Sequence, residues 1–130
     1  MAFVSKEVVV SCSPEAAWDA VRDVGALHTR LVAGFVTNTR LEGDHREVTF
    51  ADGRSVRELI IDIDDSARRL VYSVVGGRMT HDNAVVQVFP HEHGARIVWQ
   101  RDLLPKELAG PVAASMEAGV QAMKRTLERG

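Results

Sequence analysis

The chain has 130 residues, of which 45% are hydrophobic and 26% charged; this is typical of an ordinary globular protein, and the length fits one domain over residues 1–130. Sixteen Lys and Arg residues against 18 Asp and Glu residues give a formal charge of −2 with both signs interspersed, so we expect no nucleic-acid partner. A single cysteine favours a cytoplasmic location over a disulfide-linked secreted protein, and the absence of an apolar run of roughly 18 residues argues against membrane insertion.

The N-terminal part of the chain predicts a strand followed by a helix. Residues 3–10 are rich in valine, which fits a half-buried strand. Ser13 can cap a helix, and Pro14 suits the first helical position because its missing N–H has no partner there. Apolar residues at three- and four-residue steps extend the helix until Gly25, and a second short helix or turn is expected at residues 26–30.

The middle of the chain predicts an antiparallel meander. Six β-branched segments follow one another without an intervening helix, and short turns rich in Gly and Asp join them. We expect strands at residues 34–41, 46–50, 54–63, 69–75, 83–89 and 95–103.

The C-terminal part of the chain predicts one long helix from Lys106 to the end. Its apolar stripe, at three- and four-residue steps, consists of Leu108, Val112, Met116, Val120, Met123 and Leu127. Gly110-Pro111 is expected to kink the helix. Because no other element is long enough to cover the sheet, the expected fold is α+β, with a seven-stranded curved antiparallel sheet wrapped around this helix.

Two segments carry a resemblance to a known family. One runs from Ser13 to Asp19 and on to Gly25, and the other from Gly94 to Trp99 and on to Pro105. At these residues the chain resembles the SRPBCC superfamily of START-like helix-grip proteins, and within it the polyketide cyclase/dehydrase-like group. The resemblance covers essentially the whole chain and implies a hydrophobic cavity between sheet and C-terminal helix. Many members have a tryptophan and a proline where this chain has residues 28–31 (His-Thr-Arg-Leu), so we expect a different cavity mouth.

Strand parity predicts which side chains face that cavity. In residues 54–63, Arg57 shares its parity with Leu59, Ile61 and Ile63, so these residues are expected to face inward. The same rule places Arg101 beside Trp99 on an inner face, together with Ile97 and Leu103. It also places Tyr72 inward with Leu70 and Val74, and a buried Tyr72 hydroxyl would need a partner.

An arginine on an apolar inner face allows two interpretations. Arg57 and Arg101 could bind a carboxylate, enolate or phosphate of a ligand, or they could form an internal ion pair or extend to solvent. Trp99 could be a ligand platform or part of the core. His28, at the expected mouth, is a candidate acid or base. Met116 and Val120, from the helix stripe, complete the expected ligand-binding set.

The sequence supports no metal or nucleotide cofactor. His91, Glu92 and His93 supply three potential zinc ligands, but they lie in a predicted hairpin without a further ligand at a characteristic spacing. The chain lacks a Gly-x-Gly-x-x-Gly motif, a phosphate-binding loop and a Gly-x-Ser-x-Gly elbow. We therefore expect neither a cofactor nor a catalytic triad.

Three functions remain compatible with the sequence. The leading hypothesis is a monomer or homodimer that binds a hydrophobic or amphipathic small molecule, lipid-like or polyketide-like, in its cavity. The alternative is a polyketide cyclase or dehydratase, in which Arg57 or Arg101 would stabilise an enolate and His28 or Tyr72 would move a proton. A module that receives a partner's peptide is the third, and it would need an exposed apolar patch.

Overall fold

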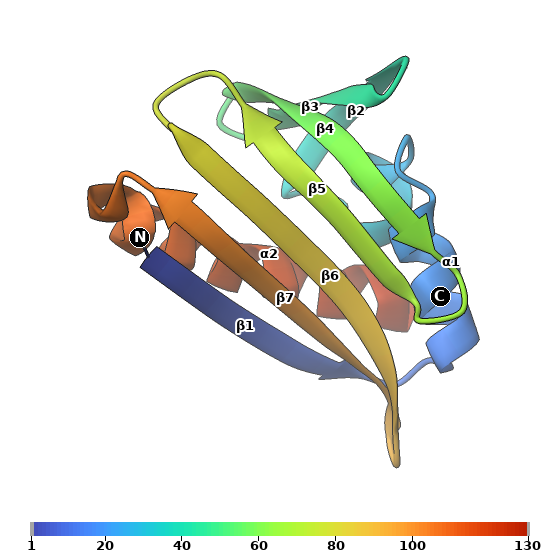
Figure 1. Ribbon diagram of the computed structural model, residues 1–130. Coiled ribbons are helices and arrows are strands. Elements are labelled where there is room, and N and C mark those ends of the chain that lie inside the picture. Colours follow the sequence, from blue (N-terminus) through green and yellow to red (C-terminus); the bar gives the residue numbers. More distant parts are fainter. Residues whose placement is uncertain (1, 130) are drawn as a thin grey trace.

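The computed structural model describes residues 2–129 and contains one seven-stranded antiparallel sheet with a long helix packed against it (Figure 1). The strand order is β1-β7-β6-β5-β4-β3-β2, so the meander ends beside the first strand. The strands are β1 (Ala2–Val10), β2 (Val36–Glu42), β3 (His45–Phe50), β4 (Ser55–Asp64), β5 (Arg69–Val75), β6 (His81–His91) and β7 (Gly94–Leu104). The helical segments are α1 (Pro14–Arg22), η1 (Leu27–Leu31), η2 (Lys106–Leu108) and α2 (Ala109–Arg129). The α+β fold expected from the sequence is confirmed.

The start of α1 follows its predicted chemistry. The Ser13 hydroxyl oxygen accepts a hydrogen bond from the Ala16 N–H at 3.0 Å, and Pro14 occupies the first helical position. The buried side of α1 includes Trp18 and Val21. The expected second helix is a single π-helical turn, η1, whose Leu31 is buried. Both segments cover the end of the sheet opposite to η2 (Figure 1).

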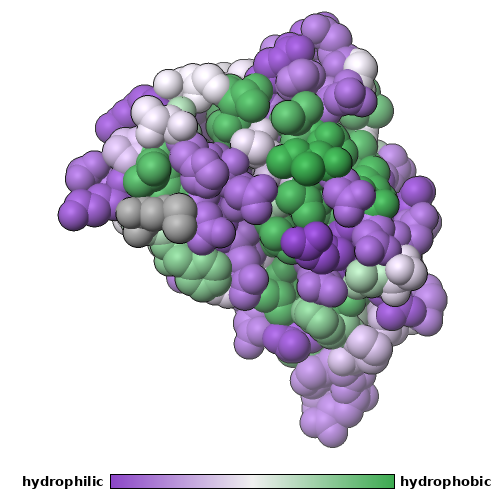
Figure 2. Space-filling model, in the orientation of Figure 1, coloured by the Kyte–Doolittle hydropathy of each residue, from purple (hydrophilic) through white to green (hydrophobic). Residues whose placement is uncertain are grey.

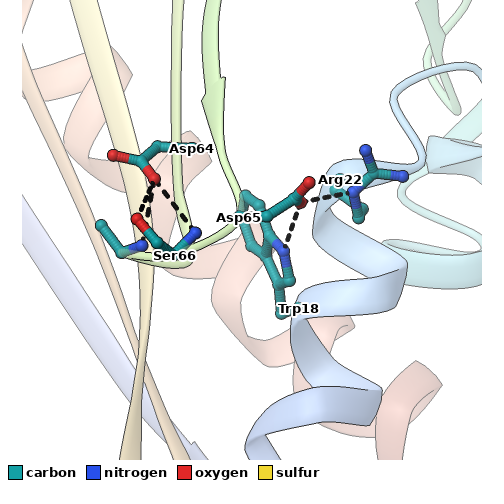
Figure 3. Close-up of polar contacts among 6 residues, drawn as sticks. Trp18, Arg22, Asp64, Asp65 and Ser66 are labelled. Carbon is teal, nitrogen blue, oxygen red and sulfur yellow. Dashed lines mark hydrogen bonds and ion pairs between the residues drawn. The ribbon is translucent and has the colours of Figure 1, made fainter.

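The carboxylate of Asp65, in the turn between β4 and β5, connects α1 to the sheet by two hydrogen bonds (Figure 3). Asp65 Oδ1 accepts hydrogen bonds from Trp18 Nε1 at 2.9 Å and from Arg22 Nε at 2.7 Å. The Arg22 and Trp18 hydrogen bonds hold the pKa of Asp65 below its usual value. The neighbouring Asp64 shapes the turn by accepting hydrogen bonds from the Ser66 N–H and hydroxyl.

We expect the Asp65→Asn substitution to lower the melting temperature at neutral pH but not in acid. The pKa of Asp65 is lower in the folded state than its ordinary value of 3.8. The ionised Asp65 carboxylate therefore stabilises the folded state fully above pH 3.8, and this stabilisation disappears as the pH falls through the folded-state pKa. Melting curves of wild type and variant from neutral pH to about pH 2 would measure this difference. Asp44→Asn is the control, because no hydrogen bond or ion pair of the Asp44 side chain occurs within residues 2–129. A constant difference at all pH values would contradict the prediction.

The helix α2 packs mainly against β1 and, to a smaller extent, against η1. Met116 is fully buried with Val4 and Leu103, and Val120 is buried in the larger core cluster. Pro111 is the third residue of α2, where the N–H has no partner within the helix, so proline removes no hydrogen bond there. The structure therefore gives no reason for the kink that Gly110-Pro111 was expected to cause.

The sheet turns its other face away from α2, and Figure 2 shows that face. Charged and polar residues lie between hydrophobic ones there. None of the helices in the described part of the chain is long and apolar enough to span a membrane.

Candidate ligand-binding site

A cavity of about 460 Å³ lies between the inner face of the sheet, η1 and α2. This volume is within the range of about 300–1,000 Å³ that ligand pockets occupy. The walls are mostly apolar and include Leu31, Val36, Phe35, Val48, Phe50, Val56, Leu70, Val86, Trp99, Leu108, Val112 and Met123. The charged side chains among the lining residues are Arg46, Arg54, Glu58, Arg78 and Arg101. The site is therefore an apolar chamber with a small number of polar groups.

Arg46 and Glu58 form a buried ion pair in the cavity wall. They lie directly opposite each other on β3 and β4, and Arg46 Nε donates a hydrogen bond to Glu58 Oε1 at 2.7 Å. Their side chains are only 3% and 7% exposed. Arg46 Nη1 also donates to the Val24 carbonyl oxygen at 3.2 Å, which ties β3 to the segment between α1 and η1.

Tyr72, Arg101 and Asp82 form a second buried polar group on β5, β7 and β6. Arg101 Nη2 donates a hydrogen bond to the Tyr72 hydroxyl oxygen at 3.2 Å, and Arg101 Nε lies 2.8 Å from Asp82 Oδ1 as an ion pair without hydrogen-bond geometry. Asp82 Oδ2 accepts the Val74 N–H at 2.8 Å. Burial raises the pKa of Tyr72 to about 12 and also raises the pKa of Asp82, against the opposing effect of Arg101.

The Tyr72 ring connects the two polar groups. The guanidinium carbon of Arg46 lies 5.0 Å from the ring centroid, and that of Arg101 lies 5.5 Å from it. Both distances are within the range of cation–π attraction. The result is a continuous polar strip, Glu58-Arg46-Tyr72-Arg101-Asp82, across the five neighbouring strands β3 to β7 of the inner face.

Trp99 lies between this strip and α2. Its ring centroid is 5.7 Å from the Arg101 guanidinium carbon. On its other side, a Cβ atom at Gly119 would stand only 2.7 Å from Trp99 Cζ3. The absence of a side chain at Gly119 therefore allows the indole ring to lie against the helix backbone, where it forms part of the cavity wall.

The structure brings together three of the residues predicted for the site. Tyr72, Trp99 and Arg101 all line the cavity, and their inward orientation on β5 and β7 is confirmed. For Arg101 the two interpretations of the sequence coincide, because it pairs with Asp82 and still lines the cavity.

The predicted orientation is wrong for Arg57, Leu59 and Ile61. The register of β4 against β5 shifts between Ile60 and Asp62, so Ile61 is an extra residue that reverses strand parity. Ile61 is 51% exposed, Leu59 is absent from the cavity wall, and Arg57 forms an exposed ion pair with Glu42 at 3.5 Å. Glu58 occupies the inner face instead.

Three other predicted residues lie near the cavity but do not line it. His28 lies on η1 with its Nδ1 3.1 Å from the Thr39 hydroxyl oxygen, while its neighbour Leu27 faces the cavity. Met116 and Val120 are buried against β1, β7 and the core, and Val112, Ser115 and Met123 are the residues of α2 that line the cavity. His91, the last residue of β6, and His93, in the turn that follows it, do not line the cavity.

Sequence analysis missed the Arg46–Glu58 pair. Arg46 shares its parity with Val48 and Phe50, so the alternation within β3 was a usable signal that its side chain faces inward. Glu58 had no such signal, because the bulge at Ile61 cannot be read from the alternation of residues in β4.

The fold and the cavity together define a helix-grip protein, in which a curved sheet and a C-terminal helix enclose an internal chamber. The chain belongs to the polyketide cyclase/dehydrase and lipid transport family, whose model matches residues 1–129. This membership confirms the resemblance seen in the sequence, and it implies a protein that binds a small hydrophobic molecule in its cavity.

Solved structures agree with this fold. An uncharacterised protein from Bacillus thuringiensis is 18% identical and superposes with a TM-score of 0.84 over 97% of this chain and 98% of its own. A protein from Thermobifida fusca is 26% identical, with a TM-score of 0.80 over 99% and 95% of the two chains. The di-domain ARO/CYC protein BexL, from the BE-7585A biosynthetic pathway, is 11% identical with a TM-score of 0.82; this chain covers 47% of BexL. No curated protein matches the chain.

Proposed function

We propose that this protein binds an amphipathic small molecule, lipid-like or polyketide-like, and that it acts as a carrier or binding protein rather than as an enzyme. The observation that supports this most directly is the cavity of about 460 Å³ with apolar walls and a single polar strip. An apolar chamber favours a hydrophobic ligand, and a few placed polar groups fix its orientation. Its single-domain organisation over residues 1–130 and its cytoplasmic location are parts of the same proposal.

The polar strip supports a ligand that carries an oxygen atom. Tyr72 accepts a hydrogen bond from Arg101, and its own hydroxyl proton remains available as a donor. A carbonyl or hydroxyl oxygen of the ligand next to Tyr72 would accept that proton. A pure hydrocarbon would leave the hydroxyl without an acceptor, which costs free energy in a buried site.

The chemistry of the lining residues favours binding over catalysis. Burial raises the pKa of Tyr72 to about 12, so the hydroxyl is a hydrogen-bond donor and not a base near neutral pH. Glu58 and Asp82 are each engaged by an arginine. Among the residues that the structure describes, no histidine lines the cavity, and His28 contacts Thr39 instead.

The proposal predicts that filling the cavity abolishes binding. Val112 lines the cavity from α2, so Val112→Trp should lower the affinity for decanol and for the aromatic polyketide emodin by about tenfold or more. Isothermal titration calorimetry measures the affinities. Ala118→Trp is the matched control, because Ala118 lies on the exposed side of the same helix.

Native mass spectrometry of the gently purified protein provides an independent check. A bound hydrophobic molecule that is recovered chemically unchanged after incubation supports a carrier. Conversion of an added linear polyketide mimic into a lighter cyclised product would show that the protein is an enzyme. If none of these ligands binds the wild type, or if Val112→Trp and Ala118→Trp bind equally well, the cavity is not the binding site.

A further inference from the structure

The cavity opens at one end of the molecule. Most lining residues are buried or half-buried, but six are exposed: Arg54, Ser55, Gly76, Gly77, Arg78 and Pro111. They belong to the turn between β3 and β4 with the first residue of β4, to the loop between β5 and β6, and to the first turn of α2. Figure 1 shows these three segments at the same end of the molecule. We call these six residues the mouth.

The charge at the mouth is positive. Arg46 is paired with Glu58 and Arg101 with Asp82, so the deeper arginines are neutralised. The mouth itself has Arg54 and Arg78 and no acidic residue. The only carboxylate paired with either of them in residues 2–129 is that of Asp52, 3.7 Å from Arg54 Nε, and both of these side chains are more than half exposed.

Arg54 is held at the boundary between the mouth and the apolar chamber. Its guanidinium carbon lies 4.8 Å from the centroid of the Phe50 ring, and Phe50 lines the cavity. The Phe35 ring packs edge-on against Phe50 at a centroid distance of 5.4 Å. Met79 adds apolar wall on the side of the loop that carries Arg78. A molecule bound in the cavity would therefore have positive charge at the mouth on one end and hydrophobic walls directly next to it.

We propose that the ligand is an amphiphile with a negatively charged head group, such as a carboxylate, which lies between Arg54 and Arg78, while the rest of the molecule, apolar apart from the oxygen atom that faces Tyr72, fills the chamber. This inference rests on the proposed function and specifies its ligand class. Guanidinium groups bind carboxylate, sulfate and phosphate through paired hydrogen bonds. A head group at the exposed mouth keeps part of its hydration, so its desolvation cost is smaller than at the buried strip.

Affinities for matched ligands test this assignment. Decanoate, decanol and decyltrimethylammonium have the same alkyl chain but negative, neutral and positive head groups. We expect wild type to bind decanoate most tightly and decyltrimethylammonium most weakly. The double variant Arg54→Gln/Arg78→Gln should lose about tenfold in affinity for decanoate and keep its affinity for decanol. Added salt should weaken decanoate binding to wild type selectively.

Two further variants control the experiment. Arg57→Gln removes an exposed arginine that lies outside the cavity, and it should leave decanoate binding unchanged. Arg54→Lys/Arg78→Lys retains the charge and should recover most of the affinity. These variants and the salt titration keep the test valid if the double glutamine variant does not fold.

The outcomes separate the two proposals. The proposal of an anionic head group would be overturned if wild type bound decanoate and decanol with equal affinity, or if the double glutamine variant lost affinity for both ligands equally. Either result would leave the proposal of a hydrophobic ligand-binding cavity in place. Decyl sulfate and decyl phosphate distinguish the kinds of anion. If neither decanoate nor decanol binds wild type, both proposals fail.

Discussion

Replacing Arg46 with methionine is expected to lower the free energy of unfolding by about 3 kcal/mol or more. The substitution leaves the Glu58 carboxylate, 7% exposed, without the guanidinium that it contacts at 2.7 Å. Removing one partner from a buried ion pair is far more costly than removing both, because the remaining charge keeps its desolvation penalty. The variant also loses the hydrogen bond from Arg46 to the Val24 carbonyl oxygen.

The double variant Arg46→Met/Glu58→Leu provides the matched comparison. It removes both charges and fills the space with apolar side chains, so most of the lost stability should return. Urea denaturation of wild type, Arg46→Met, Glu58→Leu and the double variant completes a double-mutant cycle. If Arg46→Met costs less than about 1 kcal/mol, the ion pair is solvated in solution and is not part of a closed cavity wall.

The Arg46–Glu58 ion pair also relates to the class of ligand that we propose for the cavity. The double variant should be close to wild type in stability, yet it removes two charges from the polar strip beside Tyr72. A fully apolar wall would stabilise the fold at least as well as the pair does. The five polar side chains on the inner face are therefore not required for the stability of the sheet, and they fit the oxygen-bearing ligand that we propose.

The sequence predicted the fold well because each element has a local signal. Ser13 and Pro14 mark the start of α1, and turn residues separate all the strands of the meander. Strand parity placed Tyr72, Trp99 and Arg101 correctly, since the extra residue of the β4–β5 pair lies in β4, and both β5 and β7 pair with β6 without a register shift. Regular strands therefore allow both the fold and part of the site to be predicted.

The wrong predictions of side-chain orientation occur where tertiary structure, and not the local sequence pattern, decides which way a residue faces. The extra residue Ile61 reverses the faces of β4, so Arg57 was predicted inside in the place that Glu58 takes. On α2, the apolar stripe shows that one side is buried but does not distinguish the part that meets β1 from the part that meets the cavity. Met116 meets β1, whereas Val112 meets the cavity.

Gly119 is the second position where one substitution should have a large effect. Gly119→Ala in the middle of a helix would ordinarily stabilise by up to about 1 kcal/mol, because alanine restricts the unfolded chain. Here the new Cβ would lie 2.7 Å from Trp99 Cζ3 and 3.5 Å from Phe35 Cε2, and overpacking of this kind costs about 1–3 kcal/mol. We expect a net loss of about 1 kcal/mol in the free energy of unfolding.

Gly110→Ala is the matched control on the same helix, because nothing lies within 4 Å of the position that its Cβ would occupy. It should stabilise the protein by about 0.5 kcal/mol, so the two alanine substitutions should have opposite signs. The Gly119 variant can accommodate its methyl group only by moving the Trp99 ring away from the helix backbone. Its tryptophan fluorescence and its affinity for decanol should change together, whereas Gly110→Ala should change neither. Stabilisation by Gly119→Ala would show that Trp99 does not lie against α2, and the cavity wall described above would then be wrong on that side.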